Sequence, residues 1–196
     1  MTNSEQPGNG IDRRIEPLLP EFGYACDVGA NNGIFLSNTK LFENKGWLVI
    51  CAEPHPLLAE EGRKNRKLWR QVACGPIDCQ EIKFLSVGEH PYASGSGFHP
   101  EQLGDLARKE FTVPMRRLDT LLAEVGFPKL DLLSIDTEWH EMEVIKGITL
   151  SLWKPKIIIA EALDDESAKQ MTDHLRANGY DYQFTQELDR CYMRSK

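Results

Sequence analysis

The chain has 196 residues, enough for one sizeable core, with 23 Lys and Arg against 30 Asp and Glu and a net charge of −7. This acidic balance disfavours a nucleic-acid binder, because phosphate neutralisation needs clustered basic side chains, and no apolar run approaches the roughly 20 residues of a membrane span. We therefore expect a single domain over residues 1–196, with a flexible N-terminus over 1–10 and neither nucleic-acid nor membrane partners; the oligomeric state stays open.

Strand-like apolar runs alternate with helical patterns in the first part of the chain. We expect strands over residues 24–28, 47–52 and 68–74, and helices over 34–44 and 56–67. The basic run at the end of the second helix, Arg63-Lys64-Asn65-Arg66-Lys67, is interpreted as a solvated helix end.

The second part of the chain continues the alternation. After a half-buried strand over 81–87 comes an irregular loop over 90–100, rich in Gly, Ser, Pro and His. The remaining elements are strands and helices in turn: a strand over 111–118, a helix over 119–125, a strand over 131–135, a helix over 139–149, a strand over 156–160, a helix over 164–178 that stops at Gly179, and two closing strands over 180–185 and 191–194. This order predicts an α/β, Rossmann-like fold with about seven strands, mostly parallel, with an antiparallel C-terminal strand.

The five cysteines are scattered along the chain. They are Cys26, Cys51, Cys74, Cys79 and Cys191, and no two have Cys-x-x-Cys spacing. An odd number of thiols without such spacing indicates a reducing compartment, so we expect a cytoplasmic protein.

The sharpest motif is Asp27-Val28-Gly29-Ala30-Asn31-Asn32-Gly33, between a predicted strand and a predicted helix. A ligand can approach the backbone closely at Gly29 and Gly33, where no Cβ intervenes. Glu53 closes the next strand, where a carboxylate can accept hydrogen bonds from the two ribose hydroxyls of a nucleoside cofactor.

The details of this motif discriminate between two cofactors. Dinucleotide folds use Gly-x-Gly-x-x-Gly, but Asn31 replaces the second glycine here. Asp27 would repel a pyrophosphate, whereas it suits the cationic amino group of a methionine moiety. The pattern therefore favours S-adenosylmethionine over NAD, and a tight turn without a ligand is the alternative that carries no function.

A second acidic cluster spans residues 134–141, at the end of a later strand. Ligands collect at the carboxyl ends of parallel strands, so Asp136 is predicted to face the same crevice as Asp27 and Glu53. Glu138, His140 and Glu141 are predicted to occupy the first turn of the next helix, where the helix dipole favours carboxylates. Helix capping with a solvated first turn is the alternative.

The same cluster carries groups for proton transfer. His140 is predicted to be exposed, and a histidine that titrates near neutrality could remove a proton from a substrate hydroxyl. Asp136, Glu138, His140 and Glu161 also have metal-ligand atoms, but their spacing is loose. We therefore expect no metal site and an activity that survives EDTA.

The chain resembles the FkbM-type methyltransferases from about residue 26 to residue 161. The similarity rests on motifs that occur in the same order and spacing: residues 27–33, Glu53-Pro54, Val72-Ala73, 113–119, 133–141, 144–147 and 157–161. It implies a class I methyltransferase fold and methyl transfer, usually to a hydroxyl on a sugar or secondary metabolite. The family usually has Gly where Trp139 stands, so this aromatic residue is expected to narrow the acceptor pocket or stack on the acceptor.

We expect an S-adenosylmethionine-dependent methyltransferase, acting on a hydroxyl of a small-molecule or carbohydrate acceptor. An NAD-dependent oxidoreductase and a catalytically silent binding protein on a methyltransferase scaffold are the alternatives. The predicted catalytic residues are Asp136, His140 and Glu138, and the predicted cofactor-binding residues are Asp27, Gly29, Asn31, Gly33, Glu53 and, in the adenine pocket, Ala73.

Overall fold

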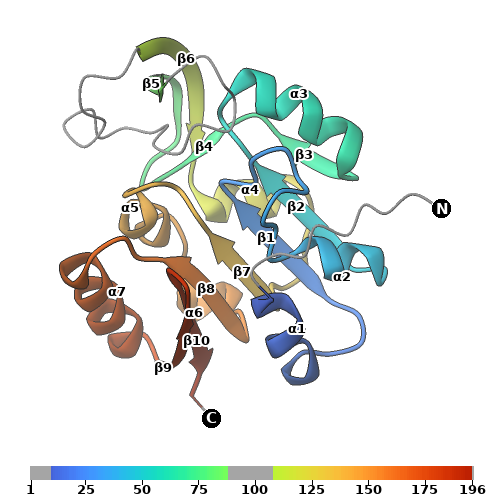
Figure 1. Cartoon of the computed structure of the whole chain (residues 1–196), viewed down its shortest axis with the longest axis vertical. Coiled ribbons are helices and arrows are strands. Elements are labelled where there is room, and N and C mark those ends of the chain that lie inside the picture. Colours follow the sequence, from blue (N-terminus) through green and yellow to red (C-terminus); the bar gives the residue numbers. More distant parts are fainter. Residues whose placement is uncertain (1–9, 88–107, 196) are drawn as a thin grey trace.

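The computed structural model describes residues 10–87 and 108–195, and its main feature is a seven-stranded sheet (Figure 1). The strands are β1 (Tyr24–Val28), β2 (Leu48–Ala52), β3 (Leu68–Arg70), β7 (Leu132–Ile135), β8 (Ile157–Glu161), β9 (Tyr180–Gln186) and β10 (Asp189–Arg194), in the spatial order β3-β2-β1-β7-β8-β10-β9. β1 pairs in parallel with β2 and β7, and the outer pairs β2–β3 and β7–β8 are also parallel. β10 runs antiparallel to both β8 and β9.

The predicted fold class is confirmed. The sheet has seven strands, β1 lies near its centre, and the two closing strands form the predicted hairpin. The central strands are almost continuously apolar, such as Ile157-Ile158-Ile159-Ala160 in β8, because they are buried on both faces.

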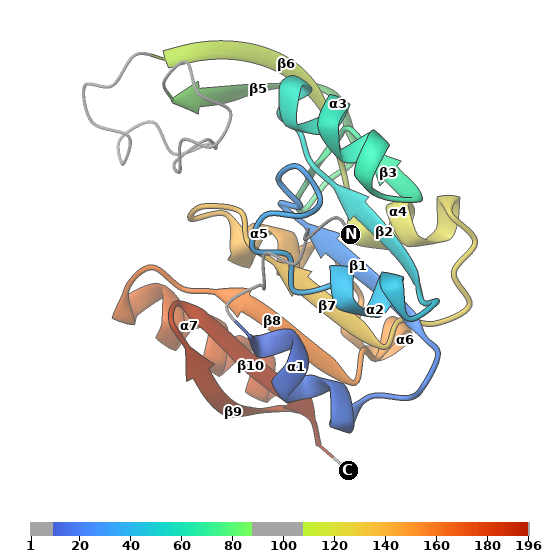
Figure 2. The ribbon, with the colours of Figure 1, turned by 45° about the vertical axis from the view of Figure 1, so that its right-hand side comes forward.

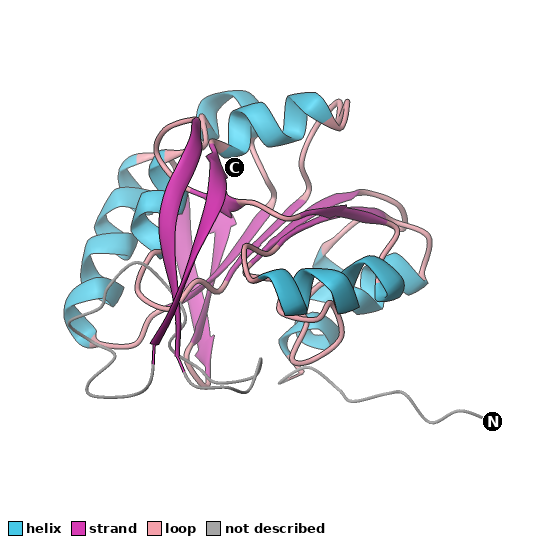
Figure 3. Cartoon of the chain, turned by 90° about the horizontal axis from the view of Figure 1, so that it is seen from above, coloured by secondary structure: helices cyan, strands magenta, loops and turns pink. Residues whose placement is uncertain are grey.

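Helices cover both faces of the sheet (Figure 3). α7 begins with a capping box between Asp164 and Ser167 and ends before Gly179, whose φ of 81° suits a glycine. In the part of the chain that the structure describes, no helix is long and apolar enough to span a membrane. The helices are α1 (Ile11–Ile15), the 3₁₀ helix η1 (Glu16–Leu18), α2 (Lys40–Asn44), α3 (Pro56–Asn65), α4 (Leu118–Glu124), α5 (Glu141–Lys146), α6 (Leu150–Trp153) and α7 (Asp165–Ala177).

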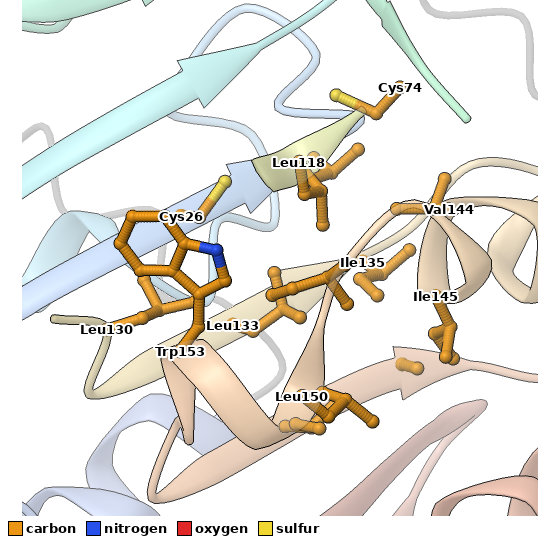
Figure 4. Close-up of a cluster of buried hydrophobic side chains, with 14 of the residues drawn as sticks. Cys26, Cys74, Leu118, Leu130, Leu133, Ile135, Val144, Ile145, Leu150 and Trp153 are labelled. Atoms are coloured by element: carbon orange, nitrogen blue, oxygen red, sulfur yellow. The ribbon is translucent and has the colours of Figure 1, made fainter. Parts of the chain in front are cut away.

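The core consists of two main apolar clusters, one on each face of the sheet, because side chains alternate along a strand. One face, which we call the α4 face, carries Cys26, Leu133 and Ile135, packed with residues of α4, α5 and α6 (Figure 4). The other, the α1 face, carries Ala25 and Leu132 together with residues of α1, α2 and α3. The same alternation decides which side chains meet at the end of the sheet.

A second, three-stranded sheet was not predicted. It consists of β4 (Ala73–Cys74), β5 (Cys79–Val87) and β6 (Arg108–Arg116), in the order β4-β6-β5, and lies beside α3 at one end of the molecule (Figure 2). The predicted single strand over 68–74 is therefore wrong. Its first half pairs with β2 in the large sheet, and its second half leaves to pair with β6. The predicted loop over 90–100 lies outside the described residues.

Two predicted helices are shorter than expected, because residues in the left-handed region interrupt them. In the helix predicted over 34–44, Leu36 has a φ of 50°, and the helical part begins only at α2. In the helix predicted over 139–149, Trp139 has a φ of 78°, and α5 begins at Glu141.

Candidate active site

The predicted site lies at the edge where β1, β2, β7 and β8 end and where the antiparallel β10 begins. Side chains alternate between the two faces along a strand, so every second residue lies on the same face. Ala25, Val49, Leu132 and Ile157 lie on the α1 face, which fixes the face of the other residues in their strands. The acidic residues on this face are Asp27, Glu53, Asp136, Glu161 and Asp189. Strands far apart in the sequence thus bring five carboxyl groups to one face near one edge of the sheet.

The turn after β1, which we call the cofactor turn (residues 29–39), starts with three left-handed residues. Gly29, Asn31 and Gly33 have φ angles of 77°, 51° and 82°. A Cβ on Gly29 would lie 1.6 Å from the carbonyl oxygen of Asp136, and a Cβ on Gly33 would lie 2.6 Å from Cγ of Arg66. Protein atoms therefore occupy the space into which a Cβ would project at these two glycines, and the approach of a ligand to their backbone stays a prediction.

Glu53 keeps the place predicted for a ribose-binding carboxylate. It is buried, with Oε2 accepting the backbone N–H of Asn31 at 3.1 Å and Oε1 accepting that of His55 at 2.8 Å. Burial raises the pKa of Glu53 to about 7. Each carboxylate oxygen has two acceptor sites, so one backbone bond per oxygen leaves capacity for two ribose hydroxyls. The residues therefore fit an adenosyl cofactor at this point.

Ala73 lies in a different environment from the one predicted. It is the first residue of β4 in the second sheet, it is buried, and it belongs to a small apolar cluster with Phe84 and Val113. A contact between Ala73 and adenine stays a prediction.

Asp27 is buried in an ion-pair network beneath the cofactor turn. Its Oδ2 accepts hydrogen bonds from Ser37 Oγ at 3.0 Å and Thr39 Oγ1 at 2.5 Å, and it lies 3.6 Å from Nη1 of Arg66. Arg66 also pairs with Glu43 at 3.2 Å. Protein groups therefore already satisfy Oδ2 of Asp27, and its predicted contact with the methionine amino group stays a prediction.

Arg66 is a residue that sequence reasoning misjudged. It was expected in a solvated basic run, yet its side chain is fully buried while those of Arg63 and Lys64 are exposed. Arg66 donates to the carbonyl of Gly33 at 2.9 Å and to Thr39 Oγ1 at 2.7 Å, so it bonds both the middle and the C-terminal end of the turn. The signal available in the sequence was weak, because only the position after the last turn of α3 distinguishes Arg66 from its basic neighbours.

Three carboxyl groups form what we call the carboxylate row: Asp136, Glu161 and Asp189. Asp189 pairs with Glu161 across β10 and β8, and the pairing of Ile135 with Ala160 puts Asp136 beside Glu161. Sequence reasoning missed Asp189, since the predicted strand began only at Cys191. An antiparallel strand starts at the edge where its parallel neighbours end, and this rule could have identified it.

The members of the row differ in exposure. Asp189 is buried, Glu161 is partly buried and Asp136 is exposed. The pKa of Asp136 is raised well above its usual range. The first cause is loss of solvation, and the second is repulsion from Glu161, Glu138, Asp189 and Glu141. Burial, followed by Glu138 and Glu141, raises the pKa of Glu161 to about 7. Neighbouring carboxyl groups that raise one another's pKa values are typical of functional sites.

The segment between β7 and α5 corrects two predictions. Glu138 precedes α5, with a φ of 53°, and His140 is the N-cap, so only Glu141 lies in the first turn. His140 is only 8% exposed, so the prediction that it is exposed is wrong. Glu141 is buried as well. Its Oε1 accepts hydrogen bonds from the backbone N–H of Thr137 at 2.8 Å and from the hydroxyl of Thr137, Oγ1, at 3.1 Å.

Trp139 is partly exposed and has a φ of 78°, a conformation that an aromatic residue rarely adopts. The resemblance to FkbM-type enzymes implied a glycine at this position, and the backbone indeed has a shape that glycine prefers. Among residues 10–87 and 108–195, no three His, Cys, Asp or Glu side chains are grouped to hold a metal ion.

Comparison with solved structures defines the class. The fold is similar to a precorrin-6y C5,15-methyltransferase from Geobacter metallireducens GS-15, with a TM-score of 0.53, 11% identity, and 96% of this chain and 87% of that one covered. It is also similar to an O-methyltransferase from Bacillus cereus in complex with SAH, with a TM-score of 0.50, 12% identity, and 100% and 82% covered. The chain therefore has the class I methyltransferase fold.

The family follows from the sequence. The methyltransferase FkbM domain matches residues 27–182, so the chain belongs to the FkbM methyltransferase family. It is 28% identical to the 31-O-demethyl-FK506 methyltransferase FkbM of Streptomyces tacrolimicus, with 79% of this chain and 71% of that protein covered. It is 26% identical to the 2-O-methyltransferase NoeI of Sinorhizobium fredii (strain NBRC 101917 / NGR234), with 80% and 70% covered. The cofactor is S-adenosylmethionine.

Proposed function

We propose that this methyltransferase transfers its methyl group to a hydroxyl oxygen of a small-molecule or carbohydrate acceptor. Both relatives named above are O-methyltransferases by name, which supports oxygen as the receiving atom. The observation that carries the proposal is the arrangement of Glu53 directly after β2 and Asp136 directly after β7, which flank the cofactor turn at the same edge of the sheet.

The cofactor supplies an electrophilic methyl group, and the chain aligns the acceptor and receives its proton. Glu53 would hold the ribose, and the backbone of the cofactor turn would lie beside the methionine portion. Alignment of the acceptor oxygen behind the methyl group contributes most of the acceleration, since methyl transfer needs an in-line attack.

Asp136 is the group we assign to proton removal. It is exposed at the carboxyl edge of the sheet, and its deprotonated form is a stronger base than an ordinary carboxylate because its pKa is raised. His140 is buried and Glu138 lies in the same segment, so both are placed to support Asp136 rather than to replace it.

The test is transfer of label. Purified protein and S-adenosylmethionine with an isotopically labelled methyl group are incubated with cell extract and with simple sugars, and products are identified by mass spectrometry. The proposal expects a labelled methyl ether whose formation stops when Asp136 is changed to Asn. A label on nitrogen or carbon would contradict O-methylation, and binding of NAD in place of the labelled cofactor would favour an oxidoreductase.

A further inference from the structure

The carboxylate row crosses three neighbouring strands, β7, β8 and β10. Strands lie about 4.8 Å apart, so the row extends over about 10 Å. Like charges directly opposite each other on neighbouring strands destabilise a sheet. The groups that act most strongly on Asp136 and Glu161, apart from burial, are further carboxylates, including Glu138 and Glu141. This part of the sheet therefore concentrates negative charge.

Asn38, in the cofactor turn, lies against the row and has an amide oxygen without a hydrogen-bond donor. Its side chain is 5% exposed and lies between β7 and β10, where Nδ2 donates to Ser134 Oγ at 3.4 Å and to Asp189 Oδ2 at 3.2 Å. A carboxylate oxygen only accepts hydrogen bonds, so the amide nitrogen must face Asp189. The amide oxygen, Oδ1, is then left buried without a hydrogen-bond partner.

Glu161 also has a buried oxygen without a hydrogen-bond donor. Its Oε2 is buried and has no donor, unless a proton is shared with Asp136. Two buried acceptor atoms, Oδ1 of Asn38 and Oε2 of Glu161, thus have no hydrogen-bond donor. A buried polar atom without a partner destabilises the folded protein, so a ligand that brings donors to these two atoms gains binding free energy.

The chemistry of that ligand follows from the atoms around it. A primary ammonium has three donors, no acceptor and a positive charge, whereas a hydroxyl has one donor and adds lone pairs of its own. The position of the row in the sheet indicates whether this ammonium belongs to the cofactor or to the acceptor. Glu53, directly after β2, lies on the opposite side of β1 from the row, so β1 separates the ribose-binding carboxylate from the row.

We propose that the carboxylate row binds an ammonium group of the methyl acceptor, which is therefore an amino alcohol or an amino sugar that receives the methyl group on a hydroxyl. This inference rests on the proposed function. The ammonium contacts Glu161 and the buried end of the row, and it leaves Asp136, the exposed end, beside the hydroxyl. A proton shared between Asp136 and Glu161 leaves for solvent when the ammonium binds.

The test compares matched ligands that differ by one amino group. Binding of glucosamine and glucose, galactosamine and galactose, and ethanolamine and ethylene glycol is measured by calorimetry at neutral pH, with and without S-adenosylhomocysteine (SAH). The proteins are wild type, Glu161→Gln, and Glu166→Gln as a control on the exposed side of α7. We expect the amine of at least one pair to bind about tenfold more tightly than its hydroxyl partner, a difference lost only in Glu161→Gln.

Three results would overturn the proposal. They are the absence of amine preference in all pairs, a preference that persists in Glu161→Gln, and a role of the row in binding the cofactor. For the last, SAH is compared with its analogue that lacks the α-amino group; loss of SAH affinity alone in Glu161→Gln would assign the row to the methionine ammonium. If wild type binds no SAH, the proposed function fails, while amine preference is still measured without it.

Discussion

Asp27 on β1 and Glu161 on β8 lie on the same face of one sheet, two strands apart, and their surroundings differ. Asp27 has a buried guanidinium and two hydroxyl donors against one oxygen, and this network ties the cofactor turn to the end of α3. Glu161 has carboxylates as its strongest charged neighbours, and its pKa is raised to about 7. Charge that the protein itself compensates indicates a structural role, whereas uncompensated charge at a strand end indicates a ligand.

The largest effect is expected at Arg66. Arg66→Met leaves Asp27 and Glu43 buried without their shared cation, which should cost about 3–5 kcal/mol of unfolding free energy. Urea unfolding measures this loss. Arg63→Met is the matched control, because Arg63 is exposed on the same helix, and it should stay within about 0.5 kcal/mol of wild type. Equal effects in both variants would show that the network does not depend on Arg66.

The two regions touch at Gly29, where a second comparison is possible. Gly126→Ala adds a Cβ at a φ of 72° with nothing within 4 Å, so it should cost about 1–2 kcal/mol for the left-handed backbone alone. Gly29→Ala has a similar φ, but its Cβ collides with the Asp136 carbonyl, which should add about 1–3 kcal/mol. Thermal unfolding of the two variants separates these contributions. Equal losses of stability would mean that the Asp136 carbonyl moves aside at no measurable cost.

Asp136 provides the kinetic comparison. Asp136→Asn should lower kcat by about 100-fold, the scale of lost general-base catalysis, or about 2.7 kcal/mol of barrier. Affinity for SAH should change by less than about twofold, whereas Glu53→Gln should weaken it by about 1–3 kcal/mol. Wild-type turnover in Asp136→Asn on the true acceptor would exclude proton removal by this group.

Glu161 gives the smallest effect, with a sign that depends on pH. Because its folded pKa is about 7 and its ordinary value is 4.5, the folded state holds an extra proton between these values. The stability this proton confers is present at low pH and is lost as pH rises through about 7. Glu161→Gln keeps the neutral form, so it should be more stable than wild type by about 1–3 kcal/mol at pH 8.

At pH 4.5 or below, Glu161→Gln and wild type should unfold at nearly the same temperature, because Glu161 is then protonated in both the folded and the unfolded state. Scanning calorimetry from pH 4 to 8 measures the difference, and Glu166→Gln should show no such trend. A constant difference across this range would mean that the pKa of Glu161 is not raised.

Much of the fold could be predicted, because buried parallel strands such as β1 and β8 are mostly apolar, with a single acidic residue near the carboxyl end of each. The site was predicted best at Glu53 and Asp136, whose places at strand ends follow from the alternation of elements. The second sheet was missed because β4 continues the sequence pattern of β3, and only its partner β6, far along the chain, reveals the separation.

Some features of the site depend on contacts that no local pattern contains. The burial of Arg66 results from Asp27 and Glu43, which come from other elements. The need for glycine at position 29 results from the carbonyl of Asp136, directly after β7, and nothing in the motif itself indicates this contact. α5 is short because Glu138 and Trp139 have left-handed backbone conformations. The intrinsic propensity of tryptophan predicts a helix or a strand instead.

The place of β10 between β8 and β9 has a consequence for how the protein is made. A ribosome adds about 5–20 residues per second, from the N-terminus, so β8 and β9 emerge before the strand that separates them. Until residues 189–194 are available, β8 has an open edge that can pair with other chains, and β9 has no place in the sheet. Asp189 arrives with β10, so a growing chain assembles the ribose side of the site first and cannot complete the acceptor side until that strand has inserted.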